Sequence, residues 1–150
     1  MPLFGDRKPF EVVRSRIGLD EPQFAPDGRS IAYNAADTGR SEVYIQPFPG
    51  PAERIAVSTL GGAQPMWRAD GKELFFLAPD GTLMAAEMRD GRPAPTPPAA
   101  LFKTGLAVET IRTQYAPLPG GQQFIVLTPE REAAIRPIQV VLNWPATVRR

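Results

Sequence analysis

Apolar residues in this chain are grouped in short runs, and each run is bounded by turn residues. Clear examples are the runs at 30–34, 42–46 and 73–78, which lie between clusters of Gly, Pro and Asp. Runs of this length, rich in β-branched and aromatic residues and bordered by such clusters, predict β-strands. Eighteen Pro and 13 Gly also favour many short strands joined by turns.

The pattern of runs repeats along the chain. PQFAPDGRSIAY at 22–33 aligns with PMWRADGKELFF at 65–76, an offset of 43 residues. A third, weaker copy is YAPLPGGQQFIV at 115–126, in which Gly121 follows Gly71 by 50 residues. The proline-rich insertion at 92–98 accounts for the longer third spacing.

A period of 40 to 45 residues with four short strands per unit is typical of a β-propeller blade. The sequence therefore predicts an all-β fold, a partial β-propeller of about three four-stranded antiparallel blades. The predicted strands are 30–34, 42–46 and 54–58 in the first unit, 63–67, 73–78, 83–88 and 100–103 in the second, and 113–116, 123–128 and 138–143 in the third.

The repeat also divides the chain. Residues 1–20 are predicted to hold the outer strand of a preceding blade, at 10–15, and a linker. Blade 1 is expected at 21–60, blade 2 at 61–104, and blade 3, without its outer strand, at 105–150.

Three such units cannot close a ring, so an open arc would expose strand edges and apolar end faces. Two copies contain six units. We therefore expect either a two-fold homodimer, in which the N-terminal strand of each copy completes blade 3 of the other, or docking to missing N-terminal blades of a longer protein.

The tetrapeptide APDG occurs twice, at 25–28 and 78–81, and both copies are interpreted as turns rather than as catalytic acids. Pro presets φ, Asp bonds the local backbone, and Gly accepts positive φ. In the third unit Gly120 replaces the expected Asp, so that hairpin is expected to use a different turn. The predicted structural turn residues are Asp27, Gly28, Asp70, Gly71, Asp80 and Gly81.

Four segments carry a resemblance to a known family: PDGRSIAY at 26–33, SEVYIQPFPGPAERIAVST at 41–59, GGAQPMWRADGKELFFLAPDGTLMAAE at 61–87 and VVLNW at 140–144. They resemble TolB-like (WD-type) six-bladed propellers, and in particular the C-terminal propeller blades of bacterial serine/threonine protein kinase fusions. The chain has no Gly-rich phosphate loop, no His-Arg-Asp loop and no Asp-Phe-Gly triplet. Any kinase or peptidase activity would therefore reside in a missing domain.

Charge and residue usage exclude several function classes. Seventeen basic and 16 acidic residues leave a net charge of +1, and adjacent basic pairs occur only near the two ends, so no nucleic-acid partner is predicted. The chain contains neither Cys nor His, which removes the common imidazole base, thiol nucleophiles and Cys/His zinc sites. We predict that the chain is not an enzyme and that it has neither a cofactor nor a metal.

Ligands of propellers generally meet the inner strands or the mouth of the channel. The polar residues predicted there are channel-facing binding candidates, although they could equally solvate a water-filled channel. These candidates are Glu21, Gln23, Gln64, Arg112 and Gln114. Phe24, Trp67 and Tyr115 are assigned one repeat position and are predicted to pack between blades.

These observations predict a non-catalytic binding or interaction module with a protein or peptide partner. The resemblance implies the C-terminal part of a propeller derived from a kinase-linked sensor; the alternative is a propeller accessory domain of a prolyl-oligopeptidase-type hydrolase. No signal peptide or membrane span is recognisable, so this segment is expected to make no membrane contact and to be cytoplasmic as written. It would be extracytoplasmic if it were part of a membrane-anchored kinase.

Overall fold

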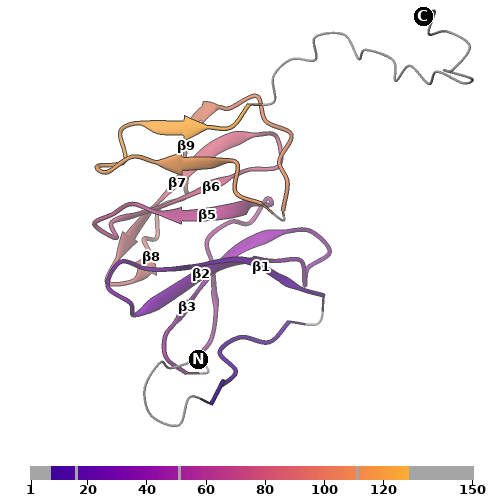
Figure 1. The fold of residues 1–150 in the computed structure, drawn as a ribbon, viewed down its shortest axis with the longest axis vertical. Coiled ribbons are helices and arrows are strands. Elements are labelled where there is room, and N and C mark those ends of the chain that lie inside the picture. The colour runs from indigo at the N-terminus through magenta and orange to yellow at the C-terminus, as the bar shows by residue number, and fades with distance from the viewer. Residues whose placement is uncertain (1–7, 16, 51, 111, 129–150) are drawn as a thin grey trace, which may run out of the picture.

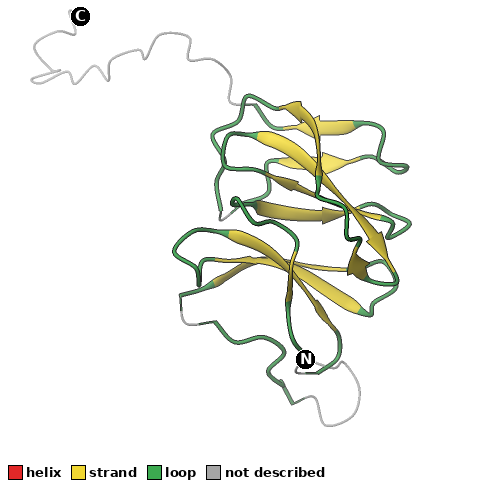
Figure 2. Cartoon of the chain, turned by 180° about the vertical axis from the view of Figure 1, so that it is seen from behind, coloured by secondary structure: helices red, strands yellow, loops and turns green. Residues whose placement is uncertain are grey.

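The fold is all-β. The structure, a computed structural model, describes residues 8–15, 17–50, 52–110 and 112–128. In that part of the chain every regular element is a strand, and loops and turns join the strands (Figure 2). The strands form two antiparallel sheets and one hairpin, which together make a partial β-propeller.

The first sheet is a four-stranded meander in chain order. Its central strands β2 and β3 are almost entirely buried, whereas β1 is half-buried or exposed, and β4 is only two residues long. The strands are β1 (Leu19–Phe24), β2 (Ser30–Ala35), β3 (Glu42–Pro47) and β4 (Ile55–Ala56).

The second sheet repeats this meander, and the third unit is described as a hairpin. Strand β7 pairs with β6 on one edge and with both β8 and β9 on the other. The strands are β5 (Ala63–Trp67), β6 (Glu73–Leu77), β7 (Thr82–Arg89), β8 (Arg92–Pro93) and β9 (Ala99–Lys103), followed by the hairpin of β10 (Tyr115–Pro117) and β11 (Phe124–Val126).

The expected strands at 113–116 and 123–128 are observed as the shorter β10 and β11, two others differ more, and one lies outside the described residues. Residues 10–15 form no strand; they belong to an irregular stretch, 8–15, that we call the N-terminal segment. Strand β4 covers only part of the predicted 54–58. A strand needs a neighbouring edge with free backbone groups, and no sheet of a preceding blade lies beside the N-terminal segment in the described part of the chain. The strand predicted at 138–143 lies outside the described residues.

The first hairpin of each unit is closed by the same backbone hydrogen bond. The N–H of Ala25 donates to the carbonyl of Ser30, and the N–H groups of Arg68 and Leu118 repeat this contact five residues ahead, all at 2.8 to 2.9 Å. Gly28, Gly71 and Gly121 have φ of 69°, 73° and 68°. Gly120 also has a positive φ, of 96°, whereas Asp27 and Asp70 at the same position do not. The third unit therefore uses a different turn, as expected, because positive φ at the third turn residue is typical of a type II turn and favours Gly.

The hairpin registers correct one assignment in the aromatic series. Phe24 pairs with Ile31, Trp67 with Leu74, and Pro117 with Phe124, so Pro117 and not Tyr115 occupies the third position. Tyr115 lies two residues earlier on β10 and is buried. The 50-residue offset between Gly71 and Gly121 also places Pro117 opposite Trp67, so Tyr115 was assigned to this position against the repeat's own spacing.

The three units stack along the long axis of the molecule (Figure 1). Two apolar cores fill the contacts between neighbours. The first joins Ala32, Val43 and Ile45 of the first sheet to Leu74 and Phe76 of the second. The second joins Phe75, Leu77 and Leu83 of the second sheet to Tyr115, Phe124 and Val126 of the hairpin.

Candidate functional site

The polar residues of the innermost strands share one repeat position. Glu21, Gln64 and Gln114 are separated by the same 43- and 50-residue offsets as the three hairpins. Glu21 and Gln64 lie in bulges of β1 and β5 and have φ of 53° and 59°. Positive φ is uncommon outside glycine and is concentrated at special sites, so this position is structurally distinctive in both sheets.

Gln64 and Gln114 bind each other across the contact between the second sheet and the hairpin. The Gln64 Oε1 accepts the Gln114 N–H at 2.7 Å, and its Nε2 donates to Gln114 Oε1 and to the Glu109 carbonyl, both at 2.7 Å. Gln114 Nε2 donates to the Ala107 carbonyl at 3.0 Å, and the Tyr115 hydroxyl donates to the Gln64 carbonyl at 2.8 Å. Both side chains are buried and hydrogen-bonded, so their polar atoms serve the contact between units instead of facing an open channel.

Glu21 is the exception in this series. Its Oε1 accepts the hydroxyl of Thr113 at 3.2 Å, whereas its Oε2 is buried and has no hydrogen-bond partner among the described residues. Burial raises the pKa of the Glu21 carboxyl above its ordinary value, and the neighbouring charge of Asp20 acts in the same direction. Contacts with Thr113 and with the backbone amide of Gln64 lower the pKa but do not outweigh the burial.

Gln23 and Arg112 do not join this group. The Gln23 carbonyl accepts the indole N–H of Trp67 at 3.3 Å, so it is the backbone of Gln23 that binds the next sheet. Arg112 is exposed and forms an ion pair with Glu109 at 2.6 Å. The structure therefore brings together three of the five channel candidates and places the other two elsewhere.

The Asp residues of the three PDG or ADG motifs bind their own turns. Asp27, Asp70 and Asp80 each accept the backbone N–H two residues ahead, at 2.9 to 3.0 Å. Asp70 also accepts two hydrogen bonds from the guanidinium of Arg68, at 2.6 and 2.8 Å. These contacts lower the pKa of the Asp70 carboxyl to about 2, with the Arg68 hydrogen bonds as the largest cause.

An open cleft lies between the first and second sheets on the side of these turns. Its volume is about 780 Å³, and it is lined by 25–27, 67–68, 70–73 and 87–91. We call it the interblade cleft. Trp67 and Met88 supply apolar surface, and Arg68 is held by Asp70 and Glu73. Lys72 and Asp90 are exposed at its rim, and neither forms an ion pair with another described residue.

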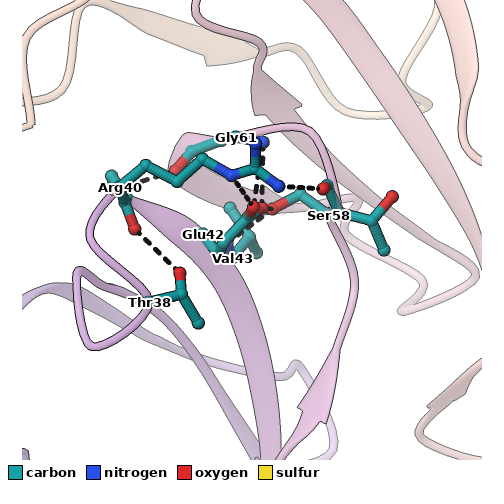
Figure 3. A network of polar contacts seen from close by, with 9 residues as sticks. Thr38, Arg40, Glu42, Val43, Ser58 and Gly61 are labelled. Atoms are coloured by element: carbon teal, nitrogen blue, oxygen red, sulfur yellow. Dashed lines mark hydrogen bonds and ion pairs between the residues drawn. The ribbon is translucent and has the colours of Figure 1, made fainter.

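Analysis of the sequence missed a buried carboxylate at the start of β3 (Figure 3). Glu42 accepts hydrogen bonds from the hydroxyl of Ser58, from the N–H of Gly61 at 3.0 and 3.1 Å, and from Arg40 Nε at 2.6 Å. The Ser58 Oγ also accepts the Val43 N–H at 2.8 Å. These bonds tie the first sheet to the loop that enters the second. A Glu beside Arg40 and Ser41 is no different in sequence from a solvated surface residue, so no sequence signal distinguished it.

The described residues contain no group of three or more acidic, His or Cys side chains that could hold a metal ion. The same residues include no helix of sufficient length and hydropathy to cross a membrane.

Comparison with known proteins finds similarity to TolB proteins in both sequence and structure. No family model matches the chain. It is 38% identical over 74 residues to the Tol-Pal system protein TolB of Alcanivorax borkumensis, a match that covers 47% of this chain and 17% of the relative. The crystal structure of TolB from Acinetobacter baumannii aligns with 80% of this chain and 43% of its own length, with a TM-score of 0.44 and 18% identity. The chain thus matches less than half of either TolB protein.

Proposed function

We propose that this chain is a non-catalytic module of the TolB-like propeller type that binds a protein or peptide partner. The 74-residue similarity to TolB supports this proposal, since that relative is named as a protein of the Tol-Pal system. Propeller folds host many different functions, so the proposed function has to be supported by the chemistry of a particular site.

The interblade cleft is the observation that supports binding of a protein or peptide. The half-buried indole of Trp67 offers apolar contact, while Lys72 and Asp90 at the rim offer charges of both signs. Aromatic anchors surrounded by a polar rim are characteristic of surfaces that bind proteins and peptides. The buried Gln pair, in contrast, is occupied by its own hydrogen bonds.

The same geometry argues against hydrolysis. Asp70 is bound to Arg68 and to its own turn, and a carboxyl with a pKa of about 2 is a poor base near neutral pH. Glu21 has a raised pKa, but its carboxylate already accepts the hydroxyl of Thr113. The chain also has no His and no Cys to serve as a second catalytic group.

We further propose that the module derives from the C-terminal half of a kinase-linked, extracytoplasmic sensor propeller. The alternative origin is a propeller accessory domain of a prolyl-oligopeptidase-type hydrolase. The gene context distinguishes them: an adjoining reading frame with a kinase domain and one membrane span supports the first origin, and a hydrolase domain supports the second.

Selection of peptides on the immobilised chain tests the proposed function. A peptide enriched from a displayed random library is expected to bind the wild type in calorimetry, and Lys72→Glu or Asp90→Lys should weaken binding by about tenfold or more, since each reverses a rim charge. Glu53→Lys, an exposed charge reversal outside the cleft, is the matched control and should bind like the wild type. Failure to enrich any peptide, or equal binding by all variants, would contradict the proposal, as would peptidase, glycosidase or phosphotransfer turnover abolished by Glu21→Ala.

A further inference from the structure

Contacts between neighbouring units follow one rule throughout the described chain. Alternate residues of the second strand point to opposite sides, so each unit has two apolar faces. The side that packs on the preceding unit is called the leading face, and the side that packs on the next unit is called the trailing face. Leu74 and Phe76 lie on the leading face of the second sheet, and Phe75 and Leu77 lie on its trailing face.

The leading face of the first sheet has no sheet packed on it among the described residues. Ile31 and Tyr33 are the repeat equivalents of Leu74 and Phe76, and they are covered by Val12 and Val13 of the N-terminal segment. Phe24, the equivalent of the half-buried Trp67, is 58% exposed on the same side. The face that packs against a neighbouring sheet in the second unit is thus covered in the first by an irregular segment, under which Ile31 and Tyr33 are 7% and 2% exposed.

The N-terminal segment covers this face without forming a strand. Its contacts include a hydrogen bond from Gln46 Nε2 to the Val12 carbonyl at 2.9 Å and one from the Ser15 hydroxyl to Asp37 at 2.6 Å. The ring of Phe10 also stacks on that of Phe48. Cavities of about 800 and 390 Å³ lie beside it. A sheet would fill that space better than an irregular segment does.

The trailing face of the third unit is exposed. Ile125 and Leu127 on and after β11 are the repeat equivalents of Phe75 and Leu77, and they are 55% and 62% exposed. Their neighbours Phe124 and Val126, on the other side of the strand, pack on the second sheet as the rule requires. In the described part of the chain, the third unit therefore has an exposed trailing face of the kind that packs on a leading face elsewhere in the molecule.

We infer that the trailing face of the third unit docks on the leading face of the first sheet in a second copy of this chain. The pairing is complementary because the same two kinds of face already pack together twice within one chain. Rings of propellers contain four to eight blades, and two copies of the three described units supply six. The dimer closes head to tail, with two equal contacts, and the N-terminal segment is displaced from Ile31 and Tyr33. This inference rests on the proposed function as an interaction module and names one of its partners.

Light scattering at micromolar concentration tests the inference. The wild type is expected to be a dimer, and Ile125→Glu, at a position that is already exposed, should raise the dimer dissociation constant at least about tenfold, because the contact would bury an unpaired charge. Leu60→Glu is the matched control: Leu60 is exposed but lies in the loop between the first two sheets, so this variant should remain dimeric. A monomeric wild type would overturn the inference. The trailing face would then be covered by the chain's own later residues or by another protein.

A mixing experiment tests the head-to-tail arrangement. Phe24→Glu and Ile125→Glu should each be monomeric alone, and their equimolar mixture should form a heterodimer, because it restores one intact contact. A pairing of two like faces predicts instead that only one of the two variants dissociates, which would overturn the inference. Ile125→Glu should keep its affinity for a peptide bound at the interblade cleft. Loss of self-association and failure of the proposed function are therefore distinguishable.

Discussion

At the scale of single residues, Glu21 carries the one carboxyl of the inner repeat position, where the other two units have Gln. Its Oε2 is buried without a hydrogen-bond partner among the described residues, and the charged groups nearest to it are Asp20 on the same strand and, if ionised, Tyr115 on β10. Burial raises the pKa of Tyr115 as well, so its phenol stays neutral at ordinary pH.

The raised pKa of Glu21 predicts a pH dependence of stability. A carboxyl whose folded pKa exceeds its unfolded value stabilises the fold fully below the unfolded pKa, and this contribution is lost as pH rises through the folded pKa. Glu21→Gln should therefore unfold at higher urea than the wild type near pH 7, and the gap should narrow toward pH 4. Glu53→Gln, at an exposed site, controls for the change in net charge; a gap that does not vary with pH would contradict the assignment.

A substitution at Gly28 tests whether the turn requires a residue with positive φ. A Cβ added at Gly28 would meet nothing within 4 Å, yet φ is 69°. Gly28→Val should cost on the order of 1–3 kcal/mol in the free energy of unfolding, because β-branched residues are strained at positive φ. Glu53→Val is a control for adding an exposed Val, and an equal loss in both variants would argue against the turn as the cause.

At the scale of elements, the contact between the second sheet and the β10–β11 hairpin depends on one buried amide. Gln64→Ala would leave the Gln114 N–H without its acceptor and remove three hydrogen bonds from the Gln64 side chain. Leaving buried polar groups unsatisfied costs about 1–3 kcal/mol per group, so we expect a loss of roughly 2–4 kcal/mol in urea unfolding. Gln23→Ala is the matched control, because Trp67 binds the Gln23 backbone, which the change retains. Equal losses would show that the network adds little.

At the scale of the whole molecule, self-association links stability to concentration. If the folded chain is a dimer and the unfolded chain is not, the melting temperature rises with protein concentration. Calorimetry over a hundredfold range of concentration should show this rise for the wild type and for Leu60→Glu but not for Ile125→Glu. A hundredfold change in concentration alters the free energy of unfolding of a dimer by about 2.7 kcal/mol. A wild-type melting temperature that does not change with concentration would contradict the dimer.

The sequence by itself determined the local features of this protein. The 43-residue offset located the two sheets, and the PDG and ADG motifs located the turns, because strand alternation and turn chemistry act over a few neighbouring residues. Even the strands β5 and β6 were predicted to within a residue of their bounds.

Only the tertiary structure decided which polar residues are buried and what they bind. Gln64 and Gln114 look like channel residues in sequence, yet they lie 50 positions apart and satisfy each other. Glu42 and Ser58 likewise meet across 16 positions, and residues 10–15 pack as an irregular segment because no sheet edge lies beside them among the described residues. The reason is physical: local propensity selects a strand or a turn, whereas the partner of a buried polar group is set by how distant segments pack.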